Sequence, residues 1–320
     1  MTFAGSADRV ESRLVPEAGF ELDTFSVSGF PRRLGPTLLQ AVWQAATAPF
    51  ACSRILARRR PDIVLGGGGY VAGPMVLAAW LRRIPIAITE ADAHVGLANR
   101  LAAPLAKRVF LAYEIRDRRG AKYRIVGRPI PVAHRGATRD EGRRQFGLPA
   151  DGPVVAVFGA LAGARSLNEM AVGAWGASGP AVLHISGERD YESLRSHVER
   201  PDYVLVPQTD HFAAALAAAD IAVSRAGGTV WELATAGTPS ILVPYPHATA
   251  DHQTLNAQHF ERGGGAIVVP DSEIARIPAL VDELLADPVR RAEMRDAMLA
   301  LARPDAGEQI AEELIRLARA

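Results

Sequence analysis

Short apolar segments alternate with segments of helical periodicity throughout this chain of 320 residues. Alternation of this kind predicts parallel β-sheets built from βαβ units, in which helices cover the faces of the sheet. The second half shows it most clearly, because each apolar segment there is short and is followed by a stretch typical of a helix. We expect its strands at 154–160, 181–187, 203–207, 220–224, 240–245 and 266–270.

The first half repeats the pattern. Its expected strands are 1–5, 21–27, 62–66, 84–89 and 108–113, and its expected helices lie near 37–59, 73–82 and 95–105. The stretch 123–136 contains prolines and glycines without a helical period, so we interpret it as an interdomain linker. The sequence therefore predicts two doubly wound, Rossmann-like α/β domains that face each other across a central cleft, with the ligand crevice at the carboxyl ends of the strands.

Domain boundaries follow from the linker. We expect an N-terminal domain at 1–132, a C-terminal domain at 133–303 and a last helix at 304–320 that packs back toward the first domain. Residues 1–132 hold 19 Lys and Arg against 10 Asp and Glu, a net charge of +9, whereas residues 133–320 carry a net charge of −8. A basic half joined to an acidic half suggests that one of them faces an anionic surface or ligand.

Two features bear on the compartment. Cys52 is the single cysteine of the sequence, so no internal disulfide can form and a reducing compartment fits best. The sequence contains no apolar run of the roughly 18 residues that a membrane span needs, and its first residues do not read as a secretory signal. We therefore expect a protein of a reducing compartment without a membrane-spanning segment.

The segment 224–237 carries the most informative motif and reads SRAGGTVWELATAG. Gly227 and Gly228 precede a predicted helix, and a helix start of this kind suits an anion such as phosphate. Glu232 lies one turn inside that helix, and its spacing from Thr229 is that of a capping box, which needs no ligand. In the other interpretation Glu232 accepts hydrogen bonds from the hydroxyls of a ribose while the glycines face a diphosphate.

A polar segment follows the next expected strand, at 244–257. It contains His252, Gln253 and Asn256, and the last two lie one turn apart on a helix face. Ligands rich in hydroxyl groups need such a mixture of donors and acceptors. An ordinary helix start capped by Asp251 explains the same residues without a ligand. We expect no metal site, because nothing completes a ligand set with the histidines of this segment.

Glycine-rich turns follow two further strands and read GALAGAR at 159–165 and GGGG at 66–69. Glycine allows the backbone to approach a phosphate closely, although small residues also serve tight packing of a strand against a helix. The binding candidates in these turns are Gly163, Arg165, Gly67, Gly68 and Gly69.

A polar loop, TEADAHVGLANR, occupies 89–100 after another expected strand. Its side chains are expected near the same crevice, where a carboxylate is suited to act as a general base. Acidic loops at strand ends are also common without any such role. We take Asp92 and Glu90 as candidate catalytic bases and Asn99 as a candidate binding residue.

Residues 32–60 combine apolar side chains with six arginines. A helix of this composition suits the surface of an anionic membrane, and the alternative is a core-packing helix with a solvated basic end. The net charge of +9 in residues 1–132 favours the membrane. Nucleic acid is not an expected partner, because aromatic residues are sparse and no recognition motif is present.

Taken together, these motifs resemble the MurG family of bacterial transferases, within glycosyltransferase family 28. The similarity runs along essentially the whole chain and is densest in GGGGYVAGPMVLAAW, GLANRLAAPLAKRVFLA, GARSLNE, SRAGGTVWELATAGTPSILVPYPH and DHQTLNA. Each motif alone is weak, and together they are specific. The resemblance implies a GT-B fold. It also implies transfer of N-acetylglucosamine from UDP-N-acetylglucosamine to the undecaprenyl-linked muramoyl-pentapeptide in peptidoglycan synthesis, which serves cell shape and division.

The resemblance also implies a role for each domain. In the second, Glu232 would hold the ribose, Gly227–Thr229 would face the diphosphate, and Gln253, with His252, would touch the sugar. The first domain would bind the diphosphate of the acceptor on its glycine loops and rest on the cytoplasmic face of the cell membrane as a peripheral protein. The reaction implied is inverting and independent of a metal or cofactor, with the acceptor hydroxyl attacking the anomeric carbon as UDP leaves.

Four departures from the family pattern stand out. The opening glycine-rich loop, with the histidine usually proposed as the base, has no counterpart, so the first βα unit is expected to be missing. Thr89–Asp92 replaces His-Glu-Gln-Asn, which leaves Asp92 or Glu90 as the base. A serine is replaced around GALAG, and Arg128 and Pro131 stand where asparagine and arginine are typical. We favour a start assigned too late in the gene of a working enzyme over a shortened, impaired chain.

Two other functions remain open at this point. One is a GT-B transferase with a different lipid acceptor, such as a diacylglycerol glycosyltransferase. The other is a catalytically silent subunit that binds a nucleotide sugar and depends on a partner chain.

Overall fold

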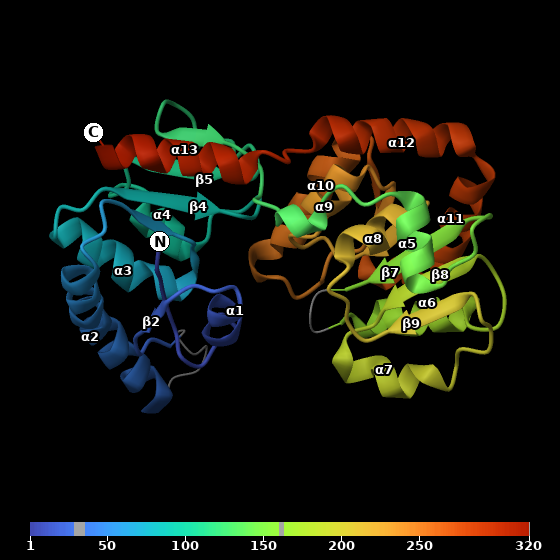
Figure 1. The fold of residues 1–320 in the computed structure, drawn as a ribbon, viewed down its shortest axis with the longest axis horizontal. Helices are drawn as coiled ribbons and strands as arrows, with labels where there is room; N and C mark the ends of the chain where they lie inside the picture. The colour runs from blue at the N-terminus through green and yellow to red at the C-terminus, as the bar shows by residue number, and fades with distance from the viewer. Residues whose placement is uncertain (29–35, 160–162, 320) are drawn as a thin grey trace. The chain divides into compact units, whose positions relative to one another are not determined.

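The computed structural model describes residues 1–28, 36–159 and 163–319, of which 36–42 and 45 are described by their backbone alone. Contacts within the chain divide it into two compact units (Figure 1). Unit 1 comprises Met1–Ala91, Val95–Val126 and Glu308–Ala320, and unit 2 comprises Asp92–His94 and Gly127–Gly307. Each unit is built from parallel strands with helices packed on them, as the alternating sequence pattern predicts.

Within its described residues, unit 2 contains a six-stranded sheet in the order β9-β8-β7-β10-β11-β12, and every neighbouring pair is parallel. The chain runs outward from β7 to one edge and then returns to β10 on the other side of β7, which is the strand order of the dinucleotide-binding fold. The turns after β7 and β10 therefore leave the carboxyl edge of the sheet at neighbouring points. The strands are β7 (Val154–Phe158), β8 (Ala181–Ile185), β9 (Tyr203–Val206), β10 (Ile221–Ser224), β11 (Ser240–Leu242) and β12 (Ala266–Val268).

The strands of unit 2 are mostly apolar, and most of their residues are buried. Val155 and Val157 of β7 pack in one cluster with Leu167, whereas Val154 packs with Ala215 in another, as the alternation of side chains along a strand requires. The described helices of unit 2 are η1 (Val132–His134), α5 (Arg139–Phe146), α6 (Arg165–Trp175), α7 (Glu188–Arg195), α8 (Phe212–Ala218), α9 (Val230–Ala236), η2 (Thr249–Asp251), α10 (His252–Arg262), η3 (Asp271–Arg276), α11 (Ile277–Ala286) and α12 (Pro288–Leu301).

Unit 1 contains a parallel sheet in the order β3-β4-β5-β6 and a separate parallel pair, β1-β2. The C-terminal helix α13 packs on the larger sheet, where Ile310 and Leu314 contact a cluster with Ala87 and Phe110. The strands are β1 (Phe3–Gly5), β2 (Leu22–Thr24), β3 (Val64–Gly66), β4 (Ile86–Glu90), β5 (Arg108–Leu111) and β6 (Tyr123–Ile125), and the helices are α1 (Glu11–Glu17), α2 (Pro36–Arg59), α3 (Gly69–Leu81), α4 (Leu97–Ala102) and α13 (Ala306–Arg319).

The expected linker at 123–136 is partly wrong. Its first residues form the edge strand β6, which pairs with β5 from Val109 to Leu111. Among the described strands β6 pairs with β5 alone, and two of its three residues are exposed. Its sequence therefore lacks the apolar run that marks a buried strand. Helix α3 also begins four residues earlier than expected, at Gly69. None of the described helices is both long enough and apolar enough to cross a membrane.

Candidate functional site

The turn between β10 and α9 contains the glycines and the carboxylate that the sequence singled out. Thr229 has a helical backbone, with φ −58° and ψ −17°, and within the described chain its side chain caps no amide of α9. Oε1 of Glu232 lies 2.5 Å from Nδ1 of His134, and the Glu232 side chain is 14% exposed. The capping-box interpretation of Thr229 and Glu232 is therefore wrong, and the carboxylate points toward another segment of unit 2.

A guanidinium group lies directly over the same turn. If Gly228 carried a Cβ atom, that atom would lie 2.3 Å from Cζ of Arg128, a distance that real side chains do not reach. Residue 228 must therefore be glycine for Arg128 to take this position. The arrangement places a positive charge on the backbone that the sequence predicts to face a diphosphate, and an arginine is well suited to bind phosphate oxygens.

Helix α10 contains the polar residues expected at 252–256, and their side chains make different contacts. Gln253 accepts a hydrogen bond from the amide of Tyr245 at 2.9 Å, and its Nε2 lies 4.0 Å from the ideal Cβ position of Gly227. His252 makes a local contact, Nδ1 to the carbonyl oxygen of Thr249 at 2.8 Å. Gln253 thus reaches the glycine turn, whereas the described contact of His252 stays within its own loop.

Asn256 is fully buried and holds the backbone around the turn. Its Nδ2 donates to the carbonyl oxygen of Ala226 at 3.2 Å and to Oδ1 of Asp92 at 3.0 Å, and its Oδ1 accepts from the amide of Ala93 at 2.8 Å. Asn256 therefore acts as a brace that fixes Asp92 and Ala226. These contacts are structural, whereas the sequence suggests a ligand-binding role for this residue.

The glycine turn after β7 is described at its two ends, and residues 160–162 of GALAG lie outside the described residues. Gly163 has a positive φ of +73°, and a Cβ atom there would lie 2.3 Å from the carbonyl oxygen of Ser186. Packing against the end of β8 thus requires this glycine without any ligand. Arg165 is 68% exposed and lies 3.9 Å from Oδ1 of Asp190.

Arg225 follows β10 and links the segments around the carboxyl edge of the sheet. Its Nη1 lies 2.7 Å from Oδ1 of Asp271, and its Nη2 donates to Oγ of Ser166 at 2.7 Å. Nη1 also donates to the carbonyl oxygens of Val243 and Pro244 at 3.2 Å each. This nearly buried arginine therefore ties the turn after β10 to the start of α6 and the end of β11.

In unit 1, Glu90 and Asn99 form a packed cluster with the glycine run. Oε2 of Glu90 accepts from the amide of Gly96 and from Nδ2 of Asn99, both at 2.9 Å. Gly68 has a φ of +85°, and its ideal Cβ position lies 3.1 Å from Nδ2 of Asn99. The backbone conformation and this close approach account for Gly68 structurally, whereas a Cβ atom at Gly67 would meet nothing within 4 Å.

The basic end of α2 is partly used within unit 1. Arg58 and Arg59 both bind the carboxylate of Asp23, and the hydrogen bond from Arg59 holds the pKa of Asp23 below its usual value. Arg32 and Arg33 lie outside the described residues. The expected membrane segment 32–60 therefore presents less free positive charge than its sequence suggests.

Large apolar side chains are nevertheless exposed on three helices of unit 1. Helix α2 packs on α3, and α3 packs on α4. On α4, Leu97 and Leu101 are each 69% exposed and share one face, because they are four residues apart. We call the following residues the exposed apolar set: Trp43, Phe50, Leu77, Trp80, Leu81, Leu97 and Leu101.

His134 is not among the site residues predicted from the sequence, and Arg128 enters there only as a departure from the family pattern in the linker. Both lie in GRPIPVAHR, where basic residues follow glycine and prolines without a recognisable motif. The excess of basic residues in that segment was the available signal. Among the described residues, no group of three or more His, Cys, Asp or Glu side chains is placed to hold a metal ion.

Comparison with protein families gives matches in both halves of the chain. The glycosyltransferase family 28 N-terminal domain matches residues 2–111, and the glycosyltransferase family 28 C-terminal domain matches residues 154–310.

Relatives match along almost the whole chain. A Salinibacter ruber protein is 39% identical over 327 residues, covering 99% of this chain and 88% of that protein. A Halothermothrix orenii protein is 34% identical, covering 94% and 87%. Both are named UDP-N-acetylglucosamine–N-acetylmuramyl-(pentapeptide) pyrophosphoryl-undecaprenol N-acetylglucosamine transferase.

Solved structures also match this chain along nearly its whole length. Acinetobacter baumannii MurG is 26% identical with a TM-score of 0.78, covering 98% of this chain and 90% of that one. The calicheamicin glycosyltransferase CalG4 is 16% identical with a TM-score of 0.67, covering the same shares, and supports the fold alone. These likenesses confirm the expected GT-B fold class.

Proposed function

The chain belongs to glycosyltransferase family 28, and on that basis we propose that it transfers N-acetylglucosamine from UDP-N-acetylglucosamine to N-acetylmuramyl-(pentapeptide) pyrophosphoryl-undecaprenol. This is the reaction for which its relatives are named. One observation carries the assignment to unit 2. Glu232 lies one turn after Gly227–Thr229, and its carboxylate contacts His134 instead of taking part in a cap of its own helix.

The donor binds at the carboxyl edge of the sheet of unit 2 in this proposal. Its ribose hydroxyls donate to Glu232, and its diphosphate lies on the amides of Gly227–Thr229 close to Arg128. The sugar lies toward Gln253. Supporting this placement, Arg128 and Gln253 both lie close to the glycines of one turn, and that turn leaves the sheet where the strand order reverses.

The transfer inverts the anomeric carbon. The acceptor hydroxyl oxygen attacks that carbon from the face opposite UDP, and the bond from the carbon to the diphosphate oxygen breaks. UDP leaves with the electron pair, and the hydroxyl proton passes to a carboxylate base. Asp92 suits the role of base better than Glu90. Glu90 is buried and its Oε2 accepts two hydrogen bonds, whereas Asp92 is half-buried and the hydrogen bond from Asn256 holds its Oδ1 in place.

The proposal assigns stabilisation of the departing diphosphate to Arg128 and to backbone amides, without a metal or cofactor. We expect the transfer rate to be unchanged after dialysis against EDTA and assay in its presence. Activity that returned only when Mg²⁺ or Mn²⁺ was added back would contradict this part of the proposal.

Unit 1 is proposed to rest on the cytoplasmic face of the cell membrane through the exposed apolar set, because apolar side chains beside arginines bind anionic lipid surfaces. We expect binding to phosphatidylglycerol vesicles that weakens with salt and is lost on replacing Leu97 and Leu101 by serine. The matched control is Val289→Ser, which changes an equally exposed apolar residue of unit 2. Equal vesicle binding by the wild type, the double serine variant and Val289→Ser would contradict the proposal that the exposed apolar set binds the membrane.

The reaction itself is tested with purified protein, UDP-N-acetylglucosamine and a lipid-linked muramoyl-pentapeptide acceptor. Mass spectrometry should show the acceptor gaining one N-acetylhexosamine while UDP is released in equal amount, and Glu232→Ala should abolish both. Binding of the UDP-sugar without transfer would instead support the silent-subunit alternative. Transfer to diacylglycerol but not to the muramoyl acceptor would support the other lipid glycosyltransferase.

A further inference from the structure

A pocket of about 510 Å³ lies in unit 2, between α8, α9 and α12, with the segment from His134 to Arg139 as a further wall. Asp220 and Pro239 also line it, and they directly precede β10 and β11. The pocket thus reaches the amino ends of these strands, whereas the proposed donor site lies at the carboxyl ends. Its volume is in the range of small-molecule sites, about 300–1,000 Å³.

The charged side chains around this pocket are mostly cationic. Arg135, Arg139, Arg291 and Arg295 line it, and Asp220 is the one carboxylate among the lining residues that the structure describes. The pocket therefore carries a positive charge. Guanidinium groups are well suited to bind carboxylate and phosphate groups, because they present several N–H donors in one plane.

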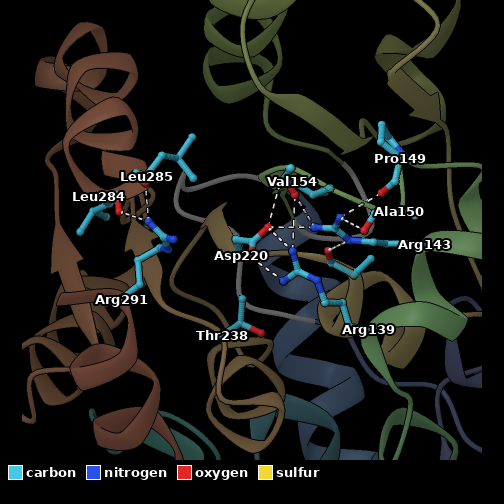
Figure 2. Close-up of polar contacts among 12 residues, drawn as sticks. Arg139, Arg143, Pro149, Ala150, Val154, Asp220, Thr238, Leu284, Leu285 and Arg291 are labelled. Atoms are coloured by element: carbon cyan, nitrogen blue, oxygen red, sulfur yellow. Dashed lines mark hydrogen bonds and ion pairs between the residues drawn. The ribbon is translucent and has the colours of Figure 1, made fainter. Parts of the chain in front are cut away.

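The carboxylate of Asp220 is already engaged, as Figure 2 shows. Oδ1 lies 2.5 Å from Nη1 of Arg139, and Oδ2 accepts hydrogen bonds from Nη2 of Arg143 at 3.0 Å and from the amide of Val154 at 2.8 Å. Arg143 is itself buried and makes further hydrogen bonds to carbonyl oxygens. Asp220 is thus shared between two arginines and does not neutralise those on α12.

Arg291 and Arg295 place two like charges on one face of α12. They are four residues apart, an arrangement that destabilises a helix when no anion lies near. Nη1 of Arg291 donates to the carbonyl oxygens of Leu284 and Leu285 at 2.5 and 2.6 Å, so its side chain is held in place (Figure 2). Within the described chain, Arg295 forms no hydrogen bond or ion pair. A bound anion would relieve the repulsion between the two.

The rest of the lining consists mostly of small apolar residues, together with His134 and three threonines. Helices α8, α9 and α12 contribute alanines and leucines to the walls, and Pro239 completes them. A ligand that fits must therefore combine an anionic group for the arginines with a compact apolar body for these walls. Such apolar walls with a few convergent polar groups are typical of small-molecule sites.

We propose that this pocket is a second binding site, which takes a small molecule carrying a phosphate or carboxylate group on a compact apolar body. The anionic group binds Arg295 together with Arg291 of α12. The apolar body packs against the alanines of α8 and α12. This assignment stands on the pocket and its charges alone and does not depend on the reaction proposed above.

Occupancy of the pocket is coupled to donor binding through His134, and this part of the inference rests on the proposed function. His134 lines the pocket, its ring centroid lies 5.8 Å from that of Phe212, and its Nδ1 contacts Glu232. A ligand that moves His134 thereby changes the position of the carboxylate proposed to hold the ribose. Coupling between two sites is reciprocal, so UDP should change the affinity of the pocket ligand by the same factor.

Titration calorimetry with phenyl phosphate, inorganic phosphate and phenol tests the pocket in the full chain. We expect phenyl phosphate to bind most tightly, because it alone has both the anion and the apolar body. Arg295→Gln should weaken it by roughly 10-fold, as expected for the loss of one charged hydrogen-bond partner. Ala292→Phe, which fills the pocket without changing its charge, should also weaken it. The matched control is Arg290→Gln, an exposed arginine of the same helix that does not line the pocket.

Equal affinity of phenyl phosphate for the wild type and all three variants, or no binding to any of them, would overturn the second site. Repeating the titration with and without saturating UDP tests the coupling. A change in affinity in the wild type that is absent in His134→Ala would support it. If UDP leaves the affinity unchanged while Arg295→Gln lowers it, the site stands and the coupling is refuted. Failure of UDP itself to bind would count against the proposed function alone.

Discussion

Unit 2 contains the pattern Thr-x-x-Glu twice, at 138–141 and at 229–232, and folds it in two different ways. At the first copy, Glu141 donates its amide to Oγ1 of Thr138 at 3.4 Å, and Oε2 of Glu141 accepts from the amide of Thr138 at 2.8 Å. This is a complete capping box. At the second copy the threonine does not cap, and Glu232 contacts His134.

The backbone conformation of each threonine explains the difference. Thr138 is extended, with φ −95° and ψ 161°, which is the conformation that turns an N-cap side chain toward the first amides of its helix. Thr229 is already helical, and the amides of Val230 and Trp231 donate to the carbonyl oxygens of Gly227 and Gly228. The turn thus begins early, at the glycines, and the amides of Trp231 and Glu232 that a cap would serve already donate to the carbonyl oxygens of Gly228 and Thr229. The carboxylate of Glu232 is therefore not needed for capping and can contact another residue.

The largest effect that separates the two copies should be on donor binding. We expect Glu232→Gln to weaken UDP binding by roughly 10- to 100-fold, because a hydrogen bond to a charged group contributes about 1.5–3 kcal/mol. Glu141→Gln, the same substitution in the other copy, should leave UDP affinity unchanged. Isothermal titration calorimetry of both variants measures this difference. Equal affinity of the two variants for UDP would remove Glu232 from the donor site.

The second effect is on the stability of the fold, and here we expect the first copy of Thr-x-x-Glu to matter more than the second. Thr138→Ala should lower the free energy of unfolding by about 1 kcal/mol, because it removes the side chain that caps α5. Thr229→Ala should change it much less, since its hydroxyl caps no amide within the described chain. Urea unfolding followed by circular dichroism compares the two variants. An equal loss in both would mean that Thr229 caps α9 in solution.

The fold could be predicted from the sequence wherever burial dictates the residues. All six expected strands of the second half were found, because a strand buried on both faces, such as β7 at Val154–Phe158, must be apolar throughout. Strand β6 at Tyr123–Ile125 was missed because its exposed edge places no such demand on its side chains. Helix α1 at Glu11–Glu17 was missed as well, and it contains no buried residue that would impose a periodic pattern.

The candidate site was predictable only in part, for a different reason. Glu232 and Gln253 stood out because local motifs mark the ends of strands and the starts of helices. His134 lies 98 residues from Glu232 in sequence, and Arg128 reaches Gly228 across a similar interval, so no local pattern reports either contact. The two copies of Thr-x-x-Glu make the same point, because spacing alone cannot tell a cap from a released carboxylate.

The smallest effect should appear in the pH dependence of stability. The hydrogen bond from the backbone amide of Thr138 lowers the pKa of Glu141 below its ordinary value, and the Thr138 side chain adds to this. A carboxyl whose pKa is lower in the folded than in the unfolded state stabilises the fold above the unfolded pKa, and loses that contribution as pH falls through the folded pKa. The stability difference between the wild type and Glu141→Gln should therefore be present at pH 7 and should decline as pH falls below the ordinary glutamate pKa of about 4.3.

The control for this effect is the same comparison made in a Thr138→Ala background. Without the threonine hydroxyl, the pKa of Glu141 rises toward its unfolded value, so the pH dependence of the Glu141→Gln difference should become smaller. Urea midpoints measured from pH 3 to pH 7 provide the test. A difference that persisted unchanged at pH 3, or that was insensitive to Thr138→Ala, would show that Glu141 contributes through something other than its ionised carboxylate.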